Sequence, residues 1–107
     1  MGERGTFKRI GIPDAEEILK KPDVVILDVR DAQSYQKGHI DKAQNVSTRN
    51  LGDVISGTRK SAPVLIYCYK GNASQEYSKI LCDFGFQDVS SLDGGYEAWS
   101  KRPAALQ

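Results

Sequence analysis

Two short, unbroken apolar runs constrain the fold of this chain most strongly. They are Val24 to Leu27 and Val64 to Tyr67, and a charged or proline-containing turn precedes each run. A strand that is apolar on both faces is one that helices cover on both sides, which is typical of a parallel sheet. Helical patterns alternate with these runs, so the sequence predicts an α/β fold with right-handed crossovers.

An amphipathic helix is predicted before the first run. Pro13 suits its first turn, and Asp14 suits its positive N-terminal end. Its apolar stripe consists of Ala15, Ile18 and Leu19. On the outer face we expect i,i+4 ion pairs, namely Glu16 with Lys20 and Glu17 with Lys21.

A second helix is predicted after the second run, where apolar residues recur at steps of three and four. The expected buried stripe is Ala73, Tyr77, Ile80, Leu81 and Phe84. Gly85 supplies a left-handed stop at the C-terminal end. Cys82 lies beside the stripe, and we interpret it as a core residue.

The remaining predicted elements are shorter. Val89 to Leu92 is expected to form a strand, Asp93 to Gly95 a turn, and Tyr96 to Trp99 a last short helix. In the middle of the chain we expect a brief strand over Ala43 to Val46 and a helical turn over Asn50 to Ile55.

Length and charge limit the classes of function. The 107 residues predict a single domain, residues 1–107. Lys and Arg total 15 against 14 for Asp and Glu, with both signs mixed, so neither a nucleic acid nor a membrane is expected as a partner. Cys68 and Cys82 lack the spacing of a metal site or a disulfide framework, which favours a reducing compartment, the cytoplasm.

The first ten residues carry charges and lack the apolar core of a signal peptide. No stretch of the sequence approaches the length of a transmembrane helix. Met1, Gly2 and Thr6 match the loose pattern for N-myristoylation, a pattern that short sequences often match by chance.

Cys68 directly follows the second apolar run. In open α/β sheets ligands bind beyond the carboxyl ends of the strands, so Cys68 occupies the position of a site. Gly71 and Asn72 tolerate unusual backbone angles, and the loop can therefore turn successive N–H groups toward one point at a helix N-terminus. These groups, the helix dipole and the Lys70 ammonium should lower the pKa of Cys68. Cys68 is thus predicted to be a nucleophile that needs no general base.

Each of these residues also has a purely structural interpretation. Cys68 could be a core cysteine, and Lys70 could be a solvated loop lysine. The position of Cys68 before a polar, glycine-containing loop favours the reactive thiol. His39 is the only histidine and lies far away in sequence, so no Cys-His-Asp set can be assembled.

Four motifs spread over most of the chain carry a family resemblance. They are Leu27-Asp28-Val29-Arg30-Asp31, Gly38-His39-Ile40, Cys68-Tyr69-Lys70-Gly71-Asn72-Ala73-Ser74, and Asp93-Gly94-Gly95 followed by Trp99. Together they resemble the rhodanese-like domains, specifically the single-domain thiosulfate sulfurtransferases of bacteria. The resemblance implies a three-layer sandwich with a central parallel sheet of about five strands flanked by helices, and an active-site loop after the fourth strand.

The resemblance also implies a reaction. Cys68 would attack the outer sulfur of thiosulfate, expel sulfite and hold the sulfur as a persulfide. A thiophilic acceptor such as cyanide or a thiol would then take the sulfur, and a thioredoxin-like protein is one candidate acceptor. Substrate contacts are expected from the rest of the loop, Tyr69, Lys70, Gly71, Asn72, Ala73 and Ser74. No metal or organic cofactor is implied.

The make-up of the loop leaves two other hypotheses open. Many rhodanese loops have Arg at the position of Ala73, so this chain could instead be a persulfide carrier or binding module that a partner protein loads, with little activity on free thiosulfate. The related phosphatases and arsenate reductases have a longer loop with an Arg at the position of Ser74. This loop contains no Arg to clamp a phosphoryl group, which disfavours that chemistry.

The other motifs are interpreted as structural. Asp28 with Arg30, and Gly38 with His39, are expected to form an ion pair or hydrogen bonds that fix the turn between strand and helix. Gly94 and Gly95 are interpreted as turn residues, and Trp99 as a core anchor.

Overall fold

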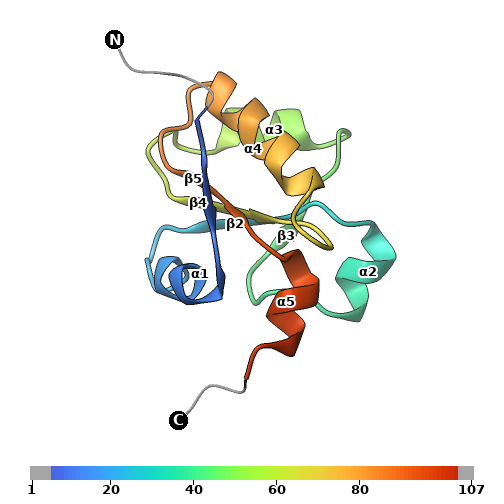
Figure 1. The fold of residues 1–107 in the computed structure, drawn as a ribbon. Coiled ribbons are helices and arrows are strands. Elements are labelled where there is room, and N and C mark those ends of the chain that lie inside the picture. Colours follow the sequence, from blue (N-terminus) through green and yellow to red (C-terminus); the bar gives the residue numbers. More distant parts are fainter. Residues whose placement is uncertain (1–5, 104–107) are drawn as a thin grey trace.

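The computed structural model describes residues 6–103 and arranges them around a five-stranded sheet (Figure 1). The spatial order of the strands is β1-β5-β4-β2-β3, and every neighbouring pair is parallel. The strands are β1 (Lys8–Ile10), β2 (Val25–Asp28), β3 (Gln44–Asn45), β4 (Val64–Tyr67) and β5 (Val89–Leu92). The predicted parallel sheet is therefore confirmed.

Five helices cover the two faces of the sheet. They are α1 (Ile12–Ile18), α2 (Ala32–Lys37), α3 (Leu51–Gly57), α4 (Ala73–Asp83) and α5 (Gly95–Lys101). In Figure 1, α3 and α4 lie on one side of the sheet, and α1, α2 and α5 lie on the other. This is the predicted three-layer sandwich.

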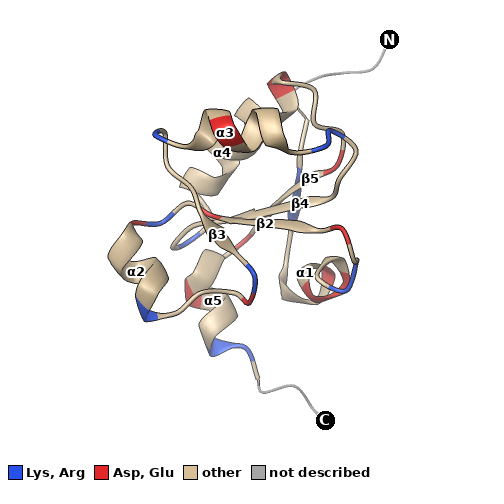
Figure 2. Cartoon of the chain, turned by 180° about the vertical axis from the view of Figure 1, so that it is seen from behind, with Lys and Arg blue, Asp and Glu red and all other residues tan. Residues whose placement is uncertain are grey.

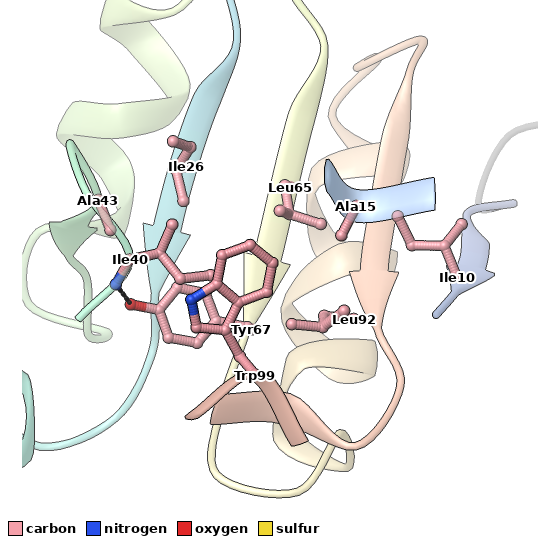
Figure 3. Packing of buried hydrophobic residues seen from close by; sticks show 9 residues of the cluster. All are labelled: Ile10, Ala15, Ile26, Ile40, Ala43, Leu65, Tyr67, Leu92 and Trp99. Atoms are coloured by element: carbon pink, nitrogen blue, oxygen red, sulfur yellow. Dashed lines mark hydrogen bonds between the residues drawn. The ribbon is translucent and has the colours of Figure 1, made fainter. Parts of the chain in front are cut away.

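Each face of the sheet carries its own apolar cluster. Figure 3 shows the cluster on the α1 and α5 side, where Trp99 packs near Tyr67 and Ile40. The Ile40 N–H donates a hydrogen bond of 3.0 Å to the Tyr67 hydroxyl, so the one polar atom of this buried ring is satisfied. The predicted role of Trp99 as a core anchor is confirmed. Cys82 belongs to the cluster on the opposite face, as expected for a core residue.

The buried face of α4 differs from the predicted one. Ile80 and Phe84 are exposed, and Phe84 has 58% of its surface accessible. The buried residues are Ser74, Ser78, Leu81 and Cys82, the same spacing displaced by one position, or about 100° around the helix. The small serine side chains can be buried because their hydroxyls are satisfied: Ser74 contacts Ser91 of β5, and Ser78 donates to the Ser74 carbonyl within α4. An apolar pattern cannot reveal this.

The predicted ion pairs on α1 are wrong. Lys20 pairs with Glu17 at 3.1 Å, Lys21 approaches Asp88 at 4.0 Å, and Arg102 pairs with Glu16 at 3.4 Å. The reason is the length of α1, which ends at Ile18. Both lysines lie beyond the helix, where the i,i+4 spacing no longer brings side chains together.

Two elements were not predicted from the sequence. The strand β1 is a short edge strand with one buried residue, and α2 buries none of its residues, so neither has an apolar pattern. Asp31 begins α2, where its carboxylate accepts a hydrogen bond of 2.7 Å from the Ser34 N–H. The other boundaries differ from the predictions by a few residues.

Charged residues of both signs are spread along the described chain. Figure 2 shows segments of both signs interspersed on both helical layers. No helix among residues 6–103 is long and apolar enough to cross a lipid bilayer. The possible myristoylation motif depends on Met1 and Gly2, which lie outside the described residues.

The serines of β5 provide a test of the packing. Ser90 is fully buried, and its hydroxyl has no hydrogen-bond partner in the described part of the chain. Because an unsatisfied buried hydroxyl is costly, Ser90→Ala should raise the free energy of unfolding by about 1 kcal/mol. Urea denaturation measures this change.

Ser91→Ala is the matched control, because it removes the same atom from the next residue of the strand. Ser91 is also fully buried, but its hydroxyl lies 2.8 Å from that of Ser74. This substitution should lower the free energy of unfolding by about 1 kcal/mol. Equal effects of the two substitutions would contradict this description of the core.

Candidate active site

Cys68 directly follows β4, which lies between β2 and β5. Its side chain is buried, and a loop of four further residues leads to the start of α4 at Ala73. The sulfur therefore lies beyond the carboxyl end of a central strand and before a helix N-terminus, where backbone N–H groups are free to bind an anion.

The loop directs hydrogen-bond donors at this sulfur. The N–H groups of Gly71 and Ser74 lie 3.1 and 3.3 Å from Cys68 Sγ, and Ser74 Oγ lies 3.5 Å from it. Burial alone would raise the pKa of Cys68, but the Ser74 hydroxyl and the N–H groups of Ser74, Gly71 and Lys70 favour the thiolate more strongly. The net result is a pKa below that of an ordinary thiol, the direction predicted from the sequence.

Gly71 gives the loop its shape. Its φ of +102° lies in the region that glycine favours, and this conformation turns its N–H toward the sulfur. A Cβ atom at this position would lie 3.0 Å from the Gly94 nitrogen and 3.3 Å from the Leu92 oxygen. The loop is therefore packed against the backbone that leads into α5.

The first turn of α5 is hydrogen-bonded to the backbone of the loop. The N–H groups of Tyr96 and Glu97 donate to the carbonyl oxygens of Cys68 and Tyr69 at 2.8 and 3.0 Å. A Cβ atom on Gly95 would lie 2.5 Å from the Tyr69 carbonyl carbon, so only glycine fits there. Gly94 and Gly95 were interpreted as turn residues, and this support of the active-site loop was missed. The pair of adjacent glycines at a helix start was the available signal.

Tyr69 connects the loop to α2. Its hydroxyl donates to the Asp31 carboxylate and lies 3.2 Å from Ser34 Oγ. The hydrogen bond from Tyr69, together with the Ser34 N–H, lowers the pKa of Asp31. The Tyr69 side chain is thus engaged with α2, while its carbonyl is held by α5.

The other predicted loop residues differ in exposure. Ser74 is fully buried and contacts the sulfur, whereas Lys70, Asn72 and Ala73 are exposed. Within residues 6–103 the Lys70 ammonium has no hydrogen-bond or ion-pair partner. Lys70 therefore adds an exposed positive charge two residues after Cys68.

A buried ion pair stabilises the segment that leads into α2. Arg30 Nη2 lies 2.6 Å from Asp28 Oδ2 and donates to the Gly38 carbonyl, also at 2.6 Å. The guanidinium lies 4.2 Å from the centre of the Tyr96 ring. The interpretation of Asp28 and Arg30 as an internal ion pair is confirmed. His39 is exposed and stacks on Tyr35, and no hydrogen bond joins it to the loop.

No group of three or more His, Cys, Asp or Glu residues within residues 6–103 is arranged to hold a metal ion. The chemistry available at the site is that of a buried thiol whose pKa is lowered by the surrounding N–H donors. Such a site favours nucleophilic attack on an electrophilic atom in an anionic molecule.

Comparison with known proteins identifies the family. The model of the rhodanese-like domain matches residues 12–102. This chain belongs to the rhodanese-like domain family. It is 43% identical over 93 residues to the thiosulfate sulfurtransferase GlpE of Pseudomonas putida, covering 87% of this chain and 84% of that protein. It is 37% identical over 99 residues to the thiosulfate sulfurtransferase GlpE of Shewanella oneidensis, covering 92% and 98% of the two chains.

A solved structure agrees with this assignment. The rhodanese-like domain of a protein from Anabaena sp. superposes with a TM-score of 0.76 at 26% sequence identity. The superposition covers 95% of this chain and 89% of that one. The predicted resemblance to the rhodanese-like family, and to its single-domain sulfurtransferases, is confirmed.

The contact between Gly95 and the active-site loop can be tested by adding one methyl group. Gly95→Ala places a Cβ against the Tyr69 backbone at a φ of +57°, so we expect a loss of at least roughly 3 kcal/mol in the free energy of unfolding. The rate at which iodoacetamide alkylates Cys68 should fall as well, because the N–H groups around the sulfur are displaced. Urea denaturation and peptide-resolved mass spectrometry measure the two effects.

Gly85→Ala is the matched control. Gly85 also has a positive φ, +99°, but a Cβ there would meet nothing within 4 Å. It should cost only about 1–2 kcal/mol and leave Cys68 alkylation unchanged. A similar loss for both variants would show that backbone conformation, rather than contact with the loop, requires Gly95.

Proposed function

We propose that this protein is a sulfurtransferase that takes sulfane sulfur from thiosulfate and carries it as a persulfide on Cys68. The observation that carries the proposal is the set of N–H groups of Gly71 and Ser74 around the Cys68 sulfur. The sequence similarity to enzymes named thiosulfate sulfurtransferase supports the choice of thiosulfate.

The first half of the reaction is a displacement at sulfur. The Cys68 thiolate attacks the outer sulfur of thiosulfate, a bond forms between Sγ and that sulfur, and the sulfur–sulfur bond of thiosulfate breaks. Sulfite leaves with the electron pair of the broken bond. We expect that no general base is needed, because the surrounding donors lower the pKa of the Cys68 thiol.

The second half returns the enzyme to its starting state. An acceptor, cyanide or a thiolate, attacks the outer sulfur of the persulfide, and the electron pair of the breaking bond returns to Cys68 Sγ. Cyanide becomes thiocyanate, and a thiol acceptor becomes a persulfide. Neither half requires an external oxidant or reductant, so the residues of the loop suffice for the chemistry.

Two kinds of group would stabilise negative charge during the reaction: the N–H groups of the loop and the Lys70 ammonium. The inward N–H groups stabilise the thiolate, which is present before attack and after transfer. Lys70 is exposed two residues after Cys68, and an ammonium close to the thiol would favour the approach of the thiosulfate dianion and stabilise the departing sulfite. Ala73 adds no charge to the loop. Binding of free thiosulfate therefore depends on Lys70 and the backbone.

The two free cysteines bear on the compartment of the protein and on its sulfur acceptor. Cys68 and Cys82 are both free thiols, which suits a reducing compartment such as the cytoplasm. We expect a small thiol or a protein thiol there, with a thioredoxin-like protein as one candidate. The exposed loop residues Asn72 and Ala73 have no long side chains that would hinder the approach of such an acceptor.

The proposal is tested by a thiosulfate:cyanide sulfur-transfer assay. Cys68→Ala should reduce thiocyanate formation to background, because the sulfur has no carrier. Lys70→Ala should lower kcat/KM for thiosulfate about fivefold, the effect of roughly 1 kcal/mol of exposed electrostatic attraction. Cys82→Ala is the control and should retain activity, since Cys82 lies in the core rather than at the site.

Activity that survives Cys68→Ala would contradict the proposal. A wild-type protein that acquires a persulfide from a cysteine desulfurase but not from thiosulfate would instead be a persulfide carrier. Ala73 is the observation that favours this alternative, because no guanidinium helps to bind a free anion there.

A further inference from the structure

A second layer of hydroxyl groups lies beneath the nucleophile. Ser74 Oγ lies 3.5 Å from Cys68 Sγ, and Ser91 Oγ lies 2.8 Å from Ser74 Oγ. Ser74 and Ser91 are both fully buried. We propose that Ser91 is a positioning residue that donates to Ser74 and so fixes the Ser74 hydroxyl proton on the Cys68 sulfur.

The topology places Ser91 where it can do this. Ser91 lies on β5, paired in register with Ile66 of β4, two residues before Cys68. Its side chain meets that of Ser74 from the first turn of α4. One hydroxyl from the sheet and one from the helix thus form a chain of contacts that ends at the sulfur.

The number of protons determines the direction of these hydrogen bonds. A thiolate has no proton, so its contact with Ser74 Oγ requires the Ser74 hydroxyl to donate. Ser74 has only one hydroxyl proton, and its contact with Ser91 therefore requires Ser91 to donate. When Cys68 is a thiolate, a single orientation satisfies both contacts.

No other group competes for these protons. Within residues 6–103, Ser74 Oγ is the only hydrogen-bond partner of Ser91 Oγ. The nearby Ser78 hydroxyl donates elsewhere, to the Ser74 carbonyl at 2.7 Å. Because linked hydrogen bonds polarise one another, the bond from Ser91 makes Ser74 a stronger donor to the sulfur.

The functional consequence rests on the proposed function, since the Cys68 thiolate is both the attacking and the leaving group in sulfur transfer. The structural claim does not need turnover to be tested. It predicts that loss of the Ser91 hydroxyl raises the pKa of Cys68. Among the described residues no hydrogen bond joins Ser91 to Cys68 directly, so the effect must pass through Ser74.

The test is the pH dependence of iodoacetamide alkylation at Cys68, followed by peptide-resolved mass spectrometry. Ser91→Ala should move the midpoint of the rate profile upward by about half a pH unit, a threefold smaller thiolate fraction below the midpoint. Ser74→Ala should move it further. In a Ser74→Ala background, Ser91→Ala should have no additional effect, because Ser91 acts through Ser74.

Ser90→Ala is the matched control, since Ser90 is equally buried on the same strand but its hydroxyl contacts no partner in the described structure. It should leave the midpoint unchanged. Protection of the core residue Cys82 in the same samples shows that each variant is folded.

Three results would overturn the inference: no shift for folded Ser91→Ala, an equal shift for Ser90→Ala, or an undiminished Ser91→Ala shift in the Ser74→Ala background. Persulfide formation from thiosulfate is measured separately on the wild type. Failure of the proposed function is therefore distinguishable from failure of the role of Ser91.

Discussion

The geometry around Cys68 depends on the close contact between the backbone of its loop and the start of α5. The carbonyls of Cys68 and Tyr69 are held by N–H groups of α5 at 2.8 and 3.0 Å. The loop then presents its own N–H groups to the sulfur instead of to solvent. Since Gly95 has no side chain, the two backbones approach closely enough for both sets of hydrogen bonds to form. The electrostatics of the thiol are therefore set by backbone dipoles that the fold has already oriented.

The position of Cys68 in the sheet explains why the thiol needs hydrogen-bond donors around it. A central strand buried on both faces delivers Cys68 to a place where water is largely excluded, and burial by itself would keep the thiol protonated. Donors must outweigh that effect, and they come from the loop and from Ser74. The same enclosure strengthens each hydrogen bond to the sulfur, because the local dielectric is low. Burial of the Cys68 thiol and the lowering of its pKa are thus two results of one topology.

The part of this site that sequence reasoning could predict is the part made by consecutive residues. The apolar run ending at Tyr67, followed by Cys68 and Gly71, is enough to predict a strand, a thiol at its end and a curved loop. Contacts between distant segments are different. The support from Gly95, the link from Tyr69 to Asp31 and the hydroxyl pair of Ser74 and Ser91 join residues 17 to 38 positions apart. Nothing in local composition specifies such pairings.

The helix α4 shows how side-chain chemistry can override apolar periodicity. Two serines occupy its buried face because their hydroxyls are satisfied by hydrogen bonds, and Phe84 is left exposed. A periodicity argument treats serine as a surface residue and so places the buried face one residue away. The displacement is small in sequence but decisive for the site, since it turns Ser74 toward the sulfur.

The central claim is that Cys68 holds sulfur covalently. Intact-protein mass spectrometry after incubation with thiosulfate, followed by removal of excess donor, tests it most directly. We predict a gain equal to the mass of one sulfur atom on the wild type, located on the peptide that contains Cys68, lost on addition of cyanide and absent from Cys68→Ala. An unmodified wild-type protein under conditions that load a known rhodanese, or a sulfur atom found on Cys82, would contradict the account.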